Sequence, residues 1–214
     1  MDFLAHGAEL FLKGGPVMYG LLLCSLIVVA IAAERFLYYR HVTLKMPVFQ
    51  EKIQRQLEQH HIEEAEQACE QSPAVIEQVA AEGLRAYRRG RNVETALENA
   101  AAFAAARLRA RLNYLSAIVT LAPLLGLLGT VVGMIDSFSV FNVQAGEPAA
   151  ITGGVGEALV ATATGLCVAM IALIAHTYLA QRLDALITDI EQAAAVLMDY
   201  LPQEVKRRDM HEIA

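Results

Sequence analysis

Few side chains in the apolar stretches of this sequence could bind or pass an ion. Hydroxyls stand at Thr130, Thr162 and Thr164, and the carboxylate of Glu157 lies near the outer end of the last stretch. A hydroxyl both donates and accepts hydrogen bonds, so hydroxyls gathered from several copies of the chain could form a polar ring. Two plainer interpretations stay open. Each threonine could bond back to its own helix, and Glu157, like Glu34, could be a mere boundary residue.

Thr130 and Thr162 are predicted to lie at the same depth in a membrane. If the second and third apolar stretches run antiparallel about a turn at Gly146, residues whose numbers sum to about 292 face each other. Both threonines then lie roughly 9 Å from the centres of their spans. Thr164 stands two residues from Thr162, and the sequence leaves open which of these two hydroxyls would face a pore.

No carboxylate lies near the centre of any apolar stretch. Ionisable groups in the middle of a membrane mark ion pathways, so this chain alone lacks a good proton carrier there. If it conducts protons, we expect another chain to supply the titrating group. His176, near the inner end of the third stretch, is more typical of a packed or interfacial histidine than of a relay.

Small residues recur at helical spacing in the second and third stretches. In lipid, such rows hold helices together by letting their backbones approach closely, although a GxxxG pair alone is a weak signal. We expect close helix packing at Gly126, Gly129, Gly133 and Gly165, and a kink at Pro123.

The composition favours a membrane protein with a modest water-exposed part. Hydrophobic residues make up 56% of the 214 residues, there is no Trp, and the formal net charge is -6. This charge disfavours a nucleic-acid partner. The three cysteines lack the spacing of metal ligands, and no catalytic constellation is visible. We therefore expect no metal, no cofactor and no enzymatic activity.

The chain is predicted to be an all-α membrane protein with three transmembrane helices and a small cytoplasmic helical domain. Each apolar run is long enough to cross a hydrocarbon core of ~30 Å. The expected segments are a periplasmic N-terminus (1–15), helix 1 (16–39), the helical domain (40–111), helix 2 (112–141), a periplasmic turn (142–150), helix 3 (151–181) and a cytoplasmic extension and tail (182–214).

The second and third transmembrane helices are expected to continue into the cytoplasm. No Gly or Pro interrupts the chain between Asn92 and Pro123, which predicts one long helix there. Lys and Arg gather after the first and third spans, whereas the 142–150 turn has none. By the positive-inside rule, we expect the N-terminus to lie outside and the helical domain and C-terminus to be cytoplasmic.

Two motifs in order give the sequence a specific resemblance. The run from Leu121 to Phe138 (LAPLLGLLGTVVGMIDSF), followed by Gly156 to Leu166 (GEALVATATGL), resembles the paired signature of the MotA/TolQ/ExbB proton channel family. The likeness is closest to the ExbB/TolQ branch. It is strong over the second and third spans, and looser over the first span and the helical domain.

The resemblance implies an inner-membrane ring of five copies around the membrane helices of two ExbD/TolR-like partner chains. The partner's membrane aspartate would carry the proton, and the proton-motive force would drive a TonB- or TolA-like protein. By motif, Thr130 and Thr162 match threonines that line the pore, and Glu157 matches a glutamate near its outer end.

The chain also departs from the family pattern. Many relatives have Ile-Pro where this chain has Met170-Ile171, so a kink expected there could be absent. Three spans instead of four argue against a MotA-type flagellar stator. The alternatives to a proton channel are a structural membrane scaffold and a self-contained small transporter.

Overall fold

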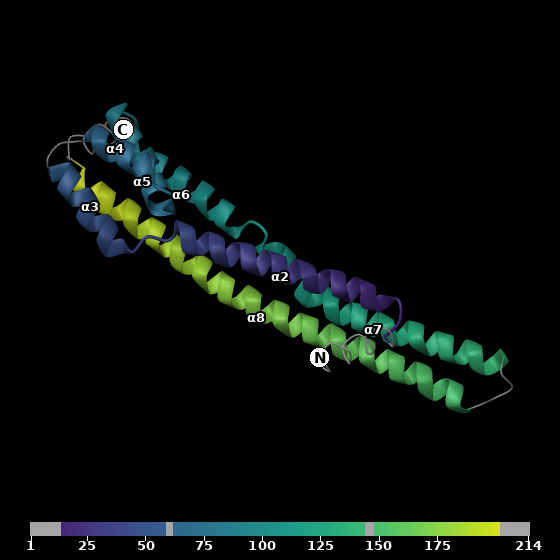
Figure 1. Ribbon diagram of the computed structural model, residues 1–214. Helices are drawn as coiled ribbons and strands as arrows, with labels where there is room; N and C mark the ends of the chain where they lie inside the picture. The colour runs from purple at the N-terminus through teal and green to yellow at the C-terminus, as the bar shows by residue number, and fades with distance from the viewer. Residues whose placement is uncertain (1–13, 59–61, 144–147, 202–214) are drawn as a thin grey trace. The chain divides into compact units, whose positions relative to one another are not determined.

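The computed structural model describes residues 14–58, 62–143 and 148–201, and these form helices joined by short turns (Figure 1). The helices are α2 (Val17–Val42), α3 (Met46–Glu58), α4 (Ile62–Glu70), α5 (Val75–Arg88), α6 (Val93–Arg109), α7 (Leu112–Val143) and α8 (Pro148–Tyr200). No strand occurs in this described part. The N-terminal segment, the middle of the turn before α8 and the tail after residue 201 lie outside it.

Three of the described helices are long and apolar enough to cross a membrane. In the most apolar stretch of each, only 17%, 28% and 33% of the residues are buried within the chain. Large apolar side chains therefore face outward along all three helices, as expected of surfaces that meet lipid or other membrane chains. The predicted all-α fold with three spans is confirmed.

The chain divides into two compact units. The membrane unit comprises residues 1–34 and 111–179, and the helical domain comprises residues 35–110 and 180–214. In the membrane unit, α2, α7 and the first part of α8 share one apolar core. Its buried residues are Met18, Leu21, Val28, Ile118, Ala122, Val168, Ala169 and Ala172.

Glycines bring α7 and α8 into backbone contact inside the membrane unit. A Cβ placed on Gly165 would lie 2.6 Å from the carbonyl oxygen of Ala122 and 3.0 Å from the Cα of Gly126. A Cβ on Gly129 would lie 2.5 Å from that of Ala161, and one on Gly133 would lie 3.2 Å from that of Ala158. A side chain on Gly165 or Gly129 would clash and one on Gly133 would be crowded, so these sequence-predicted packing positions lie at the interface of the two helices.

The helical domain combines a buried apolar core with buried ion pairs. Phe49, Ile53, Leu84 and Leu197 are fully buried there. Glu66, which is 5% exposed, accepts hydrogen bonds from Arg85 (3.2 Å) and Arg88 (2.9 Å), and so ties α4 to α5. The bond from Arg85 to Glu66 is the main cause that raises the pKa of this guanidinium, so Arg85 stays charged.

One sequence prediction is wrong: no single helix runs from Asn92 through Pro123. α6 ends at Arg109 and α7 begins at Leu112, with Arg111 between them at φ 72°. Arg35 and Tyr39 donate to the last carbonyls of α6, those of Arg107 (3.4 Å) and Leu108 (2.8 Å). Side chains distant in sequence thus satisfy the carbonyl groups that a helix end leaves free, and no glycine or proline is needed to stop it. α7 itself continues through Pro123.

Replacing the buried carboxylate should loosen the helical domain. We expect Glu66→Ala to cost about 1–3 kcal/mol, because two guanidinium groups lose their shared partner. Hydrogen exchange of α4 and α5 in the purified full chain measures the loss. Glu63→Ala is the matched control, since Glu63 also pairs with Arg88 but is exposed and 3.6 Å away. Equal exchange in the two variants would contradict the assigned role of Glu66.

The close contact between α7 and α8 can be tested by adding one methyl group at Gly165. We expect Gly165→Ala to lower the thermal stability of the detergent-purified chain by about 1–3 kcal/mol, because backbone atoms must move to admit it. Gly156→Ala is the control, since nothing lies within 4 Å of a Cβ there. Unchanged melting of Gly165→Ala, monitored by circular dichroism, would show that the two helices do not approach this closely.

Candidate functional site

Thr162 links the two central membrane helices. Its hydroxyl donates to the carbonyl oxygen of Gly126 across the α7–α8 interface at 3.0 Å. The bond is possible because Gly126 has no side chain: a Cβ there would lie 3.1 Å from the Cα of Thr162. Thr162 is only half-buried, so part of its side chain remains open beside the interface.

The other two candidate hydroxyls bond to their own helices. Thr130 donates to the carbonyl of Leu127 at 2.6 Å, and Thr164 donates to that of Val160 at 2.8 Å. The expectation that a threonine in a membrane helix bonds back to its own helix therefore holds for Thr130 and Thr164 within the chain. It does not hold for Thr162.

The contacts between α7 and α8 place Thr130 and Thr162 at nearly the same depth. Ala161 lies against Gly129, Ala158 lies against Gly133, and Ser137 lies against Gly154. The numbers of these facing residues sum to 290 or 291, close to the expected sum of about 292. The antiparallel pairing of the two helices is as expected, and the two threonines differ in depth by only about 3 Å.

Glu157 lies near one end of the α7–α8 pair. Its carboxylate oxygen Oε1 lies against Gly15 in the turn before α2, where φ is 70°. This positive φ would strain any other residue at position 15, whereas the Glu157 carboxylate ends a flexible side chain that can move aside.

Glu34 is held at the other end of the membrane unit. Its carboxylate forms an ion pair of 2.5 Å with Arg111, which is the residue with positive φ between α6 and α7. This pairing favours the interpretation of Glu34 as a boundary residue that fixes the start of α7. His176 is half-buried in α8.

Two polar residues of α7 were not singled out as site residues from the sequence. Ser137 is 3% exposed, donates to the carbonyl of Gly133 at 2.6 Å and lies against Gly154. Asp136 is exposed in the last part of α7. The signal that could have found Ser137 is its place at helical spacing after Gly129 and Gly133. Among the described residues, no group of three or more His, Cys, Asp or Glu could hold a metal.

The amino-acid sequence of this chain is similar to those of known proteins. Residues 71–192 match the family described as the MotA/TolQ/ExbB proton channel family. An ExbB homolog from Methanothermobacter thermautotrophicus, a biopolymer transport protein, is 29% identical over 193 residues, which cover 89% of this chain and 69% of the relative. An ExbB-like biopolymer transport protein from Synechocystis is 34% identical over 173 residues, covering 77% and 66%.

A shorter match links the chain to the Tol system. TolQ of Pseudomonas aeruginosa is 39% identical over 82 residues, which cover 38% of this chain and 36% of TolQ. The chain spans about two thirds of the length of the first two relatives. Since the family match includes α7, α8 up to residue 192 and all of α5 and α6, the chain belongs to the MotA/TolQ/ExbB proton channel family, in its ExbB/TolQ branch.

Proposed function

We propose that this chain is the ring-forming subunit of an ExbB/TolQ-like proton channel in the inner membrane. Five copies surround the membrane helices of two single-span, ExbD/TolR-like partner chains. Protons that pass between ring and partner supply the work that a TonB- or TolA-like protein delivers to the outer membrane. The N-terminus is periplasmic and the helical domain cytoplasmic, as the distribution of Lys and Arg indicates.

The observation that carries the proposal is how the three hydroxyls are used. Each donates its hydrogen to a backbone carbonyl, Thr162 to a neighbouring helix and Thr130 and Thr164 to their own. A hydroxyl used in this way offers only lone pairs to any further group. It can accept a hydrogen bond from a protonated carboxyl group, whereas it offers no hydrogen to a carboxylate.

This donor arrangement suits a proton-carrying partner. A hydrogen bond made only to the neutral form of an acid raises its pKa. An aspartate of the partner that reaches these hydroxyls is therefore favoured in its protonated state. The membrane spans of this chain have no carboxylate of their own near their centres, so the carried proton does not compete with an internal acid.

Thr162 has two functions in this proposal. Its hydroxyl joins α7 to α8, and its lone pairs face the proton path together with those of Thr130. Glu157 lies toward the periplasmic entrance. Close packing at Gly126, Gly129, Gly133 and Gly165 holds the two helices in register, while the exposed apolar faces meet lipid and the neighbouring copies.

Conservative replacements of Thr162 test the proposal. We expect Thr162→Val, co-purified with the single-span partner and reconstituted in liposomes, to lose proton flux by about tenfold or more, because the hydroxyl is gone. Thr162→Ser should keep most of the flux. Thr120→Val is the control, since Thr120 is an exposed threonine of α7 that bonds to its own helix and has no assigned place in the proton path.

The mass of each complex must be measured alongside the flux. Thr162→Val should still assemble with the partner, so its loss of flux reports the hydroxyl and not the ring. Wild-type flux in Thr162→Val would remove this residue from the proton path. Equal flux from the chain without its partner would instead favour a self-contained channel.

A further inference from the structure

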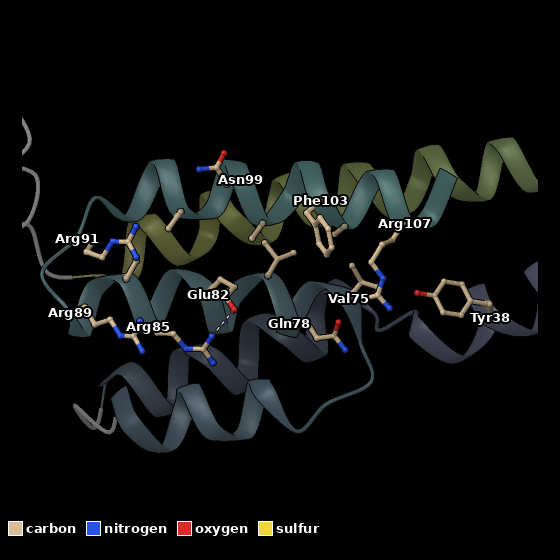
Figure 2. A pocket seen from close by; sticks show the side chains of 15 residues that line it. Tyr38, Val75, Gln78, Glu82, Arg85, Arg89, Arg91, Asn99, Phe103 and Arg107 are labelled. Carbon is tan, nitrogen blue, oxygen red and sulfur yellow. Dashed lines mark hydrogen bonds and ion pairs between the residues drawn. The ribbon is translucent and has the colours of Figure 1, made fainter. Parts of the chain in front are cut away.

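The helical domain has an elongated groove that the proton path does not use. It lies between α5 and α6 and encloses about 510 Å³, and Figure 2 shows the side chains that line it. Its walls are partly apolar, with Val75 and Val79 from α5, and Ala100 and Phe103 from α6. Phe103 is 68% exposed, so its ring is available to an occupant.

The groove is also positively charged. Four arginines line it, and one of them, Arg85, is neutralised by Glu66, Glu70 and Glu82. The other three are Arg89, Arg91 and Arg107, and no described residue forms an ion pair with their side chains. An occupant of this groove should therefore combine an apolar or small-residue surface with negative charges.

The length of the groove indicates the kind of occupant. Arg91 and Arg107 stand at opposite ends of it in Figure 2. They are separated by sixteen residues, most of them in α6, which correspond to about 24 Å of helix. A long trough of this kind fits the side of a helix better than it fits a compact small molecule.

A helix with the required face is present in the same domain. Asp184, Glu191 and Asp199 are all exposed on the second part of α8, at steps of seven and eight residues, so they lie on one side of the helix. The stripe is about 22 Å long. Exposed small residues, Ala185, Thr188 and Ala195, lie between its carboxylates.

The acidic stripe does not face the core of its own chain. Leu183, Ile190 and Leu197 of α8 are buried on the other side of the helix, and Leu197 lies near Gly83 of α5. In Figure 2, α8 runs behind α6, and no described residue of α8 lines the groove. The groove and the stripe are thus different surfaces of one domain.

We propose that the groove between α5 and α6 binds the acidic stripe of α8 from a neighbouring copy of this chain. The contact is head-to-tail, because the groove of one copy binds the stripe of the next copy and not another groove. Repeated contacts of this kind close into a ring when the rotation between neighbouring copies permits it. The stripe carries three carboxylates, and the groove carries three arginines that pair with no described residue, over similar lengths. The inference rests on the proposed function, since it assigns to the ring one of its subunit interfaces.

Cysteine cross-linking in the full chain tests this contact. Asn99→Cys places a thiol in the groove and Thr188→Cys places one on the stripe, in a background with Cys24→Ala and Cys167→Ala. Cys69 can stay, because it is fully buried and its burial raises the thiol pKa to about 11, which leaves little reactive thiolate. Membranes that contain the chain and its partner are treated with a flexible bis-maleimide.

The expected result is a ladder of cross-linked copies up to the size of the ring. Glu98→Cys with Thr188→Cys is the matched control, because Glu98 is exposed on α6 but does not line the groove. We expect the groove pair to cross-link roughly tenfold more, because thiols held side by side have a high effective concentration. Equal ladders from both pairs would overturn the proposed contact.

Charge reversal adds a second readout. The substitutions Asp184→Lys, Glu191→Lys and Asp199→Lys together should reduce the ladder. Combining them with Arg89→Glu, Arg91→Glu and Arg107→Glu should restore it. If no groove ladder forms while native mass still shows a ring, this interface is wrong but the proposed function stands. If phosphatidylglycerol copurifies and is lost on arginine reversal without any ladder, the groove binds lipid and the inference is overturned. A monomeric chain would overturn both proposals.

Discussion

The close backbone approach of α7 and α8 is the constraint on which the rest of the membrane unit depends. Lipid supplies little hydrophobic drive between helices, so dispersion contacts and polar bonds between backbones must hold them together. Gly126 and Gly165 allow this approach, and it alone brings the Thr162 hydroxyl within 3.0 Å of a carbonyl on the neighbouring helix. A larger residue at either glycine would separate the helices and break that bond. The same small residues leave the outer faces of both helices free for lipid and other chains.

The hydrogen bonds of the threonines connect this packing to the proposed proton path. Because backbone carbonyls take the hydroxyl hydrogens, the remaining lone pairs favour a protonated acid over a carboxylate. In the proposed channel, the chain therefore contributes a fixed polar surface, and a partner chain supplies the titrating group. The helical domain has a separate task in this account. Its groove and its acidic stripe carry opposite charges on different surfaces, which suits repeated contacts between identical copies.

Most of the fold could be predicted from the sequence, because the controlling signals are local. Long uncharged runs mark the three spans, and Asn92 begins α6 as a cap that accepts from the backbone of Thr95. The break at Arg111 could not be predicted, since it depends on Arg35, Tyr39 and Glu34, which are distant in sequence. The glycine positions at the α7–α8 contact were predicted from their spacing. The sequence did not predict which hydroxyl bonds across to the other helix. The register of two helices joined by a turn is uncertain by several residues, and a shift of one helical turn moves a side chain by about 5 Å along the helix.

The central claim is that this chain acts as a ring around a proton-carrying partner. The most direct test is the native mass of the detergent-purified chain, expressed alone and then with the single-span, aspartate-bearing membrane protein encoded beside it. The account predicts five copies in the first sample, and five copies with two partner chains in the second. A monomer or dimer that does not take up the partner would contradict the account, and Thr130, Thr162 and Glu157 would then have no assigned role in a proton path.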